Sequence, residues 1–160
     1  MPRNNVVRLL EARHIAHQVL SFSSEIHDAE GAAAAMGVPP QQVFKTLVVL
    51  RERGRPLLAL VPAGRQLDLR LLARSTGDKK LRMATQREAE SLTGLLVGGI
   101  SALALLNKGF EVWIDASATE WPELYVSAGE RGLNVRLPVA DLQRLTGARL
   151  APAAAEEASA

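Results

Sequence analysis

Hydrophobic and polar residues alternate along several short stretches of this chain, in the two-residue rhythm of β-strands. The run 43–50 is the clearest, because its odd-numbered and even-numbered side chains fall on opposite faces of an extended chain. A polar turn at 51–56 joins it to the apolar run 57–61, which predicts an antiparallel hairpin. Strands are predicted over residues 15–22, 43–50, 57–61, 110–114, 123–127 and 133–137.

Helices are predicted where capping residues precede stretches that can be helical. Asp28 comes before an alanine-rich stretch that Gly37 ends. Thr85, with Glu88 three residues later, is typical of a capping box. The predicted helices follow Asn4 or Asn5, cover 29–36, lie between Asp68 and Gly77, begin after Thr85, cover 102–107 with Ser101 as the cap, and run from Pro138 to Leu145.

The order of these elements mixes strands in hairpins with helices, which favours the α+β class over a doubly wound parallel sheet. We expect a single domain over residues 1–150, with a curved mixed β-sheet flanked by helices. Residues 94–101 combine apolar side chains with glycines and are expected to form a strand that breaks into a loop. The alanine-rich segment 151–160 has low complexity and no core stripe, which predicts a disordered tail.

Composition and charge exclude several classes of function. The chain has 160 residues and no cysteine, so disulfides, thiolate nucleophiles, iron–sulfur clusters and zinc ribbons are excluded. The formal charge of +2 permits contact with RNA phosphates but is far below that of a DNA-coating protein, so we expect no DNA partner. No apolar run is long enough to span a bilayer, and we expect a cytoplasmic protein without a membrane segment.

Lys45 is the one charged residue in the apolar run 43–50. Strand alternation places it on the same face as Val43 and Leu47. Burying an ammonium costs several kcal/mol by effective estimates unless an anion or hydrogen-bond acceptors compensate it. Two interpretations stay open: a functional cation in a dry recess, or a lysine near the start of a strand that extends its head into water.

Two glycine-containing loops are candidate binding loops. The first, 98–101 (Gly-Gly-Ile-Ser), precedes a predicted helix, where free backbone N–H groups can hold an anion or an ester oxygen as an oxyanion hole does. The second loop is 127–132. Either can also be an ordinary turn in which glycine supplies a positive φ. Neither has the spacing of a phosphate-binding Walker loop or a dinucleotide fingerprint.

Other residues that could carry chemistry lack partners at the necessary spacing. His14, His17 and His27 match no metal-site template, so neither a metal nor another cofactor is expected. Ser101 and Ser127 lack an identifiable histidine–carboxylate relay, which argues against a serine-hydrolase mechanism. Asp115 follows a predicted strand and is either a general base or, as is commoner, the cap of the next turn.

Basic residues gather in two predicted loops. They are either solvated surface charges or contacts to the phosphates of an RNA, and salt would weaken the latter. The clusters comprise Arg51, Arg53 and Arg55, and Lys79, Lys80 and Arg82.

Three motifs in order are 43–47 (Val-Phe-Lys-Thr-Leu), 96–101 (Leu-Val-Gly-Gly-Ile-Ser) and 126–133 (Val-Ser-Ala-Gly-Glu-Arg-Gly-Leu). Together they resemble the YbaK/EbsC family of aminoacyl-tRNA deacylases, whose relatives form the editing insertion domain of bacterial prolyl-tRNA synthetases. The likeness runs from the first predicted helix to about Leu145. It implies a single α/β domain with a curved mixed sheet and a cleft, which agrees with the hydrophobic pattern.

The resemblance also implies roles for individual residues. Lys45 would be the catalytic residue that deacylation requires. The amides of Gly98 and Gly99 would face the ester carbonyl, and the second loop would close the cleft. The implied substrate-binding residues are Phe22, Thr46, Gly98, Gly99, Ile100, Ser101, Ser127, Gly129 and Asn134.

Two departures from the family pattern leave the amino-acid specificity open. Ala102 follows the first loop where many members have proline, and Asn134 stands where the Cys-tRNA(Pro) deacylases have aspartate. Loss of a carboxylate changes which amine or hydroxyl a pocket can accept. The stretch 101–115 is also one residue longer than in the Cys-specific members.

The function that the resemblance implies is hydrolysis, in trans, of misacylated tRNA, with Cys-tRNA(Pro) or a similar small-amino-acid tRNA(Pro) as the substrate. A second hydrolytic site compensates for the poor discrimination between small side chains that binding alone provides. Two alternatives stay open: a deacylase for Ala-, Ser- or Thr-tRNA, and a non-catalytic aminoacyl-tRNA or nucleotide-binding module that regulates a synthetase. The expected partners are the acceptor end of misacylated tRNA and, as a further candidate, prolyl-tRNA synthetase.

Overall fold

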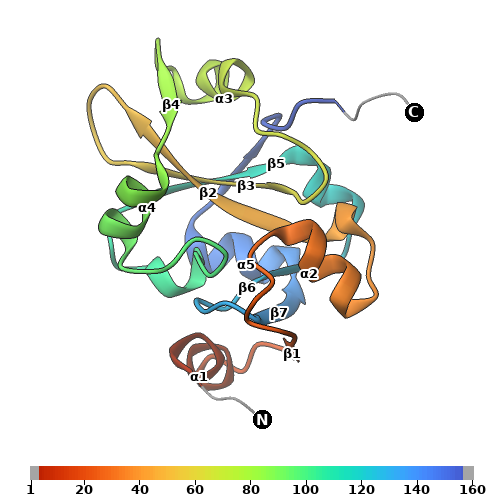
Figure 1. Ribbon diagram of the computed structural model, residues 1–160. Coiled ribbons are helices and arrows are strands. Elements are labelled where there is room, and N and C mark those ends of the chain that lie inside the picture. The colour runs from red at the N-terminus through yellow and green to blue at the C-terminus, as the bar shows by residue number, and fades with distance from the viewer. Residues whose placement is uncertain (1–3, 157–160) are drawn as a thin grey trace.

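The computed structural model describes residues 4–156 and contains helices and strands in alternation (Figure 1). The α-helices are α1 (Asn5–Ala12), α2 (Ala29–Met36), α3 (Leu69–Thr76), α4 (Gln86–Thr93) and α5 (Val139–Thr146). The strands are β1 (Gln18–Ser21), β2 (Phe44–Arg51), β3 (Leu57–Pro62), β4 (Leu81–Met83), β5 (Glu111–Asp115), β6 (Glu123–Ser127), β7 (Leu133–Pro138) and β8 (Arg149–Ala151). Short 3-10 helices lie at Pro40–Gln42, Leu103–Leu105 and Ala116–Glu120.

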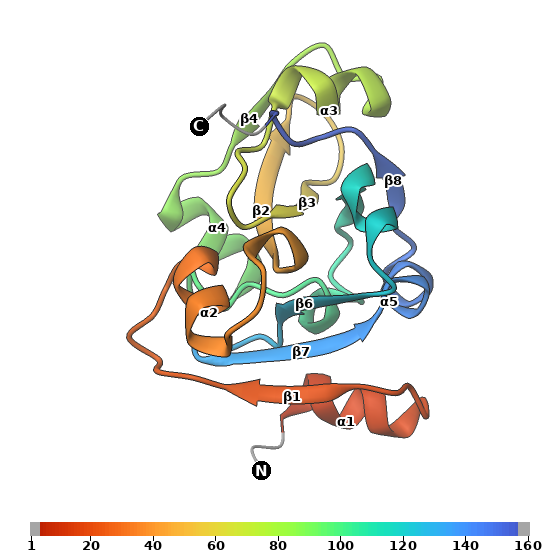
Figure 2. The same cartoon turned by 90° about the vertical axis from the view of Figure 1, so that its right-hand side faces the viewer.

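The strands form two sheets. One is antiparallel, in the order β1-β7-β6, and the other is mixed, in the order β4-β2-β3-β5-β8. A parallel bridge between Val43 and Tyr125 connects the start of β2 to β6. In Figure 2 the smaller sheet lies across the lower part of the molecule, with β1 and α1 at its outer end. The single α+β domain predicted from the sequence is confirmed, with its β-structure divided between two sheets.

The largest hydrophobic cluster lies between the two sheets, and a second covers the other face of the five-stranded sheet. Phe44 and Val48 belong to the first cluster and Val49 to the second, which confirms the predicted alternation along β2. Every residue of β3 is buried, as expected for a central strand covered on both faces. This packing holds β2 between two cores, and residues 44–48 of the strand also lie beside a cavity.

The capping residues and the hairpin are confirmed. Four predicted caps accept a backbone N–H with their side chains, and Glu88 completes the capping box at the start of α4. These caps are Asn4, Asp28, Asp68 and Thr85. β2 and β3 pair in antiparallel register from Phe44 and Pro62 to Val49 and Leu57.

Three local predictions differ from the structure. The segment with Lys79, Lys80 and Arg82 was predicted as a loop but contains β4. This edge strand has three residues and is too short to show periodicity. Residues 94–101 form no strand, because Gly94 ends α4 with a φ of 72° and a tight turn follows at 96–99. The helix predicted over 102–107 is reduced to the 3-10 turn Leu103–Leu105.

The disordered tail predicted for 151–160 is wrong for residues 151–156, while 157–160 lie outside the described residues. Ala151 ends β8, which pairs in parallel with β5, and Ala153 and Ala154 are buried. Their N–H groups both donate to Asp115 Oδ1 at 2.8 Å. Hydrogen bonds to Asp115, which lies 38 residues before Ala153, therefore order this segment although it has no regular stripe of core residues.

None of the helices within residues 4–156 combines the length and the apolar character that crossing a lipid bilayer would require.

Candidate functional site

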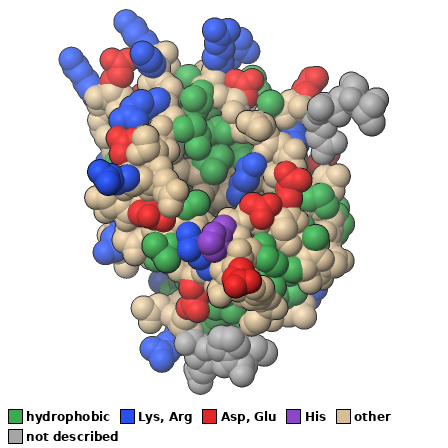
Figure 3. Space-filling model, viewed as in Figure 1, with side chains coloured by type: hydrophobic (Ala, Val, Ile, Leu, Met, Phe, Trp, Pro, Cys, Tyr) green, Lys and Arg blue, Asp and Glu red, His purple; other side chains and the backbone are tan. Residues whose placement is uncertain are grey.

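A cavity of about 390 Å³ opens between the start of α2, the first half of β2 and the loop that follows α4. Ser127 at the end of β6 and Asn134 on β7 close it on the side of the smaller sheet. Figure 3 shows this face, where apolar side chains line a hollow and basic, acidic and histidine side chains lie next to it. A concave, largely apolar cavity with a few convergent polar groups is typical of a ligand site.

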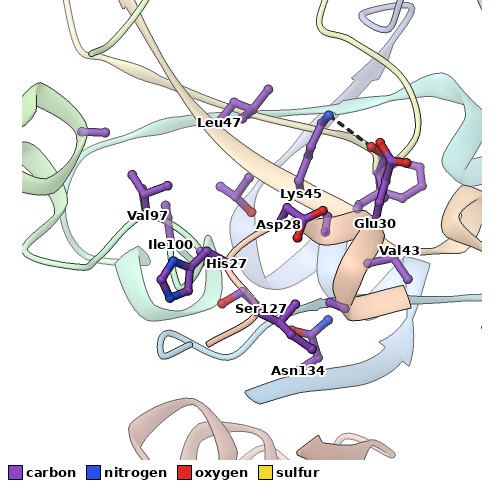
Figure 4. A pocket seen from close by; sticks show the side chains of 18 of the residues that line it. His27, Asp28, Glu30, Val43, Lys45, Leu47, Val97, Ile100, Ser127 and Asn134 are labelled. Atoms are coloured by element: carbon purple, nitrogen blue, oxygen red, sulfur yellow. Dashed lines mark hydrogen bonds between the residues drawn. The ribbon is translucent and has the colours of Figure 1, made fainter. Parts of the chain in front are cut away.

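Lys45 reaches the cavity from β2 and is half-buried (Figure 4). Its Nζ donates to the carbonyl oxygen of Ala63 at 3.2 Å. Burial lowers the pKa of the Lys45 ammonium below its usual range, and the negative charge of Glu30 opposes part of that shift. The cation is therefore only partly compensated by the protein, and it faces space that a ligand can occupy.

The turn at 96–99 forms the wall opposite Lys45. The Gly99 N–H donates to the Leu96 carbonyl at 2.8 Å, and Gly98, the third residue of the turn, has a φ of 95°. Glycine at this position is typical of a type II turn. A Cβ on Gly98 would lie 2.9 Å from the His27 carbonyl oxygen, so the start of α2 and the turn approach each other as only glycine permits.

The structure corrects the predicted roles of the two amides in this turn. The Gly99 N–H closes the turn and is not free to face an ester carbonyl. Gly98 is exposed and lines the cavity, and no acceptor within residues 4–156 lies within hydrogen-bonding distance of its N–H. The predicted pair of amide donors is thus reduced to one, at Gly98.

Hydrogen bonds from two other elements hold the turn. The Val97 N–H donates to Glu90 Oε2 on α4 at 2.8 Å, and Arg131 Nε donates to the Val97 carbonyl, also at 2.8 Å. Gly99 packs so tightly against Glu130 and Arg131 that a Cβ there would lie 2.9 Å from their backbone atoms. The two predicted loops are therefore in direct contact and position each other.

Ser127 and Asn134 face each other across the antiparallel pair β6 and β7. Ser127 Oγ accepts the Gly129 N–H at 3.2 Å. The Asn134 side chain is only 6% exposed and, among the described residues, has no hydrogen-bond partner. Asn134 lines the cavity, so its amide can pair with a complementary polar group of a ligand.

Seven of the ten predicted site residues line the cavity, whereas Gly99, Ser101 and Gly129 do not. Ser101 is 1% exposed, and its Oγ accepts the Ala104 N–H at 3.2 Å, so it caps the following 3-10 turn. Gly129 adopts a φ of 99° beside Ala104. The seven lining residues are Phe22, Lys45, Thr46, Gly98, Ile100, Ser127 and Asn134.

Sequence reasoning missed the contribution of the start of α2. His27, Asp28 and Glu30 line the cavity, and Figure 4 shows Glu30 close to the Lys45 head. Asp28 was predicted only as a cap, a role that the structure confirms. The sequence does show acidic residues at the start of a helix, shortly before a strand that contains one lysine. Their proximity in space, however, depends on how α2 packs beside β2 and cannot be predicted from that pattern.

In each of the two basic clusters, one arginine is engaged in ion pairs within the protein. Arg51 is ion-paired with Asp78 at 2.6 Å and Glu111 at 2.7 Å, and Arg82 pairs with Glu88 at 2.8 Å. The hydrogen bonds that Arg51 donates to Asp78 outweigh burial and raise the pKa of Arg51 above its usual value. The remaining members, which are exposed, are Arg53, Arg55, Lys79 and Lys80.

Comparison with known proteins gives consistent matches. A family model described as an aminoacyl-tRNA editing domain matches residues 23–145. EbsC of Enterococcus faecalis, named as a candidate Cys-tRNA(Pro)/Cys-tRNA(Cys) deacylase, is 31% identical over 157 residues, or 97% of this chain and 95% of EbsC. A proline–tRNA ligase of Nitratidesulfovibrio vulgaris is 36% identical over 72 residues, which are 45% of this chain and 12% of the ligase. The crystal structure of a candidate trans-editing enzyme for prolyl tRNA synthetase has a TM-score of 0.81 at 29% identity and covers 97% of this chain and 100% of that one.

Proposed function

The chain belongs to the aminoacyl-tRNA editing domain family, and we propose that it hydrolyses, in trans, the ester that joins a wrong amino acid to the 3′ end of tRNA(Pro). The observation that carries the proposal is the cavity itself. The partly compensated ammonium of Lys45 lies on one side of it, and on the other side is a turn whose Gly98 N–H has no partner among residues 4–156. A cation and an amide donor on opposite sides of one recess suit an ester whose carbonyl oxygen becomes negative during hydrolysis.

In this proposal Lys45 anchors the substrate or stabilises negative charge, and the Gly98 N–H orients the carbonyl. The hydrogen bond to Ala63 uses one of the three ammonium hydrogens, which leaves the others for the substrate. Water attacks the carbonyl carbon, the C–O bond to the ribose oxygen breaks, and the amino acid and the tRNA are released. If the amino acid is cysteine, its own thiol can attack instead, which breaks the same C–O bond and releases the tRNA and a thiolactone that water then opens. Holding the reacting atoms in place contributes to the rate along with charge stabilisation.

The specific substrate that we propose is tRNA(Pro) charged with cysteine, which the name of the EbsC relative supports. Asn134 favours a second candidate. It is a neutral, buried amide without a partner among the described residues, facing Ser127 across the sheet. An amide can both donate to and accept from a hydroxyl, so Ser- or Thr-tRNA is the alternative substrate that this observation favours, with Ala-tRNA as the smallest candidate.

The tRNA body would contact exposed basic side chains near the cavity. Arg53, Arg55, Lys79 and Lys80 are the candidates, because Arg51 and Arg82 are engaged in ion pairs. Figure 3 shows basic side chains gathered along one edge of the face that carries the hollow. Binding through phosphates predicts an affinity that falls as salt rises. Prolyl-tRNA synthetase is a candidate partner that would supply the misacylated tRNA.

The test is a panel of tRNA(Pro) charged separately with Cys, Ser, Thr, Ala and Pro. Purified protein is added in catalytic amounts, and ester loss is followed against buffer alone. We expect multiple turnovers on at least one wrong amino acid and no acceleration with Pro. Turnover with Cys alone would support cysteine as the substrate, whereas turnover with Ser or Thr would support the second candidate.

A non-catalytic binding module predicts a different result from the same panel. It would protect the ester in proportion to the protein added and give no turnover. Protection without turnover on every member would overturn the proposed hydrolysis.

A further inference from the structure

The central peptide of the turn at 96–99 joins Val97 to Gly98 and has its two polar groups in contrasting surroundings. Its carbonyl oxygen, on Val97, accepts a charge-assisted hydrogen bond from Arg131 Nε at 2.8 Å. Its N–H, on Gly98, has no acceptor within residues 4–156. In a trans peptide these two groups point in opposite directions, so the Gly98 N–H points away from Arg131.

We propose that Arg131 is a positioning residue that polarises the 97–98 peptide and so strengthens the Gly98 N–H as the donor to the substrate's carbonyl oxygen. This inference rests on the proposed ester hydrolysis. A cation that hydrogen-bonds one end of an amide draws electron density toward that end and leaves the N–H at the other end more acidic. The hydrogen bond from the Gly98 N–H strengthens as the substrate's carbonyl oxygen gains negative charge. Polarisation of the peptide therefore stabilises the transition state more than the bound substrate.

The rest of the site is arranged to hold this peptide in place. Glu90 accepts the Val97 N–H, which belongs to the preceding 96–97 peptide, so it anchors the turn without touching the 97–98 peptide. The tight contacts of Gly98 with His27 and of Gly99 with Arg131 restrict the turn on both sides. Arg131 and Glu90 thus anchor the same turn, but of these two residues Arg131 is the one that hydrogen-bonds the 97–98 peptide.

Because Arg131 and Glu90 bond different peptides of the turn, variants of the two residues can distinguish polarisation of the 97–98 peptide from anchoring of the turn. The experiment measures kcat and KM for the best substrate of the panel in Arg131→Met, Arg131→Lys and Glu90→Gln, together with the Gly98 ¹⁵N and ¹H amide shifts of the full chain. Arg144→Met is the matched control, because Arg144 is a 71% exposed arginine on α5 that pairs only with Asp141 among the described residues.

We expect Arg131→Met to lower kcat about ten- to a hundredfold, with KM changed by less than about twofold, since the lost interaction strengthens in the transition state. The Gly98 amide proton should move upfield. Arg131→Lys should recover part of both effects by restoring a charged donor, and Arg144→Met should leave kcat within about threefold of the wild type. Glu90→Gln, whose amide oxygen can still accept the Val97 N–H, should lower kcat much less than Arg131→Met does.

Equal losses of kcat in Arg131→Met and Glu90→Gln would overturn the proposal, because anchoring alone would then explain both. An unchanged Gly98 shift in Arg131→Met would overturn it as well. If Arg131→Met fails to fold, the comparison of Arg131→Lys with Glu90→Gln decides in the same way. Absence of turnover in the wild type would count against the proposed hydrolysis, and the Gly98 shift would still report whether Arg131 polarises the peptide.

Discussion

Lys45 and Asp115 occupy comparable places in the sequence and contrasting places in the structure. Each is a charged residue within or at the end of an apolar strand, and the two strands, β2 and β5, flank β3 in the same sheet. Asp115 is 3% exposed and accepts hydrogen bonds from Ala153, Ala154 and Ser117. Lys45 is half-buried, and within the described part of the chain its ammonium makes one hydrogen bond, to Ala63.

The contrast shows that burial of a charge does not by itself indicate function. Burial would raise the pKa of Asp115, but the hydrogen bonds from Ser117 and from the backbone of Ala153 and Ala154 outweigh it and keep that pKa below the usual range. A saturated carboxylate of this kind is a structural anchor. The Lys45 charge, in contrast, is incompletely compensated and faces a cavity, as functional groups often do.

Replacing Lys45 should separate activity from stability. We expect Lys45→Met to lower kcat/KM for ester hydrolysis by at least about a hundredfold, the range seen when one stabilising donor is removed from a site of this kind. The free energy of unfolding should stay the same or rise, because a partly buried charge is replaced by an apolar side chain of similar length. The measurements are the deacylation assay and urea denaturation; hydrolysis at the wild-type rate would remove Lys45 from the mechanism.

Replacing Asp115 should have the opposite effect. Asp115→Ala leaves the buried N–H groups of Ala153 and Ala154 without an acceptor, and we expect it to lower the free energy of unfolding by about 2–4 kcal/mol. Asp115→Asn keeps one oxygen and should cost about half as much. Well below the melting temperature, both variants should retain wild-type kcat. A hundredfold fall in kcat for Asp115→Asn would instead favour the general-base interpretation.

Features that depend on neighbouring residues could be predicted from the sequence. The caps at Asp28 and Thr85 were predictable because a side chain and a backbone N–H two or three residues away are enough to form them. The hairpin and the two faces of β2 followed from alternation. The motifs that contain Lys45 and Gly98 also identified two opposite sides of one cavity.

Features that depend on distant partners could not be predicted. The order of residues 151–156 depends on Asp115, and nothing in an alanine-rich segment indicates that acceptor. The Gly99 amide looked like a free donor, but its carbonyl partner is set by the φ of Gly98. The acidic start of α2 reaches the cavity only because the helix packs beside β2.

A titration should sharpen the assignment of Asp115 as an anchor. Because its pKa in the folded state lies below the usual value, ionised Asp115 contributes stability that is fully present above the unfolded pKa of about 3.9. That contribution is lost as the pH falls through the lower, folded-state pKa. We therefore expect the stability difference between wild type and Asp115→Asn to be constant from pH 7 to about pH 5 and to narrow below about pH 4. The measurement is the urea midpoint of both proteins from pH 3 to pH 7. A stability difference that grows as the pH falls would contradict the assignment of Asp115 as an anchor.

Thr46 extends the comparison to an uncharged group and gives the smallest expected effect. Its Oγ1 is buried and, within the described residues, has no hydrogen-bond partner, although Thr46 lines the same cavity as Lys45. Thr46→Val keeps the shape of the side chain and removes the unpaired hydroxyl, so we expect a gain of about 1 kcal/mol in the free energy of unfolding. If the hydroxyl serves the substrate, hydrolysis should slow in the same variant while the free energy of unfolding rises. Lower stability in Thr46→Val would place the hydroxyl with Asp115, among the groups that hold the fold.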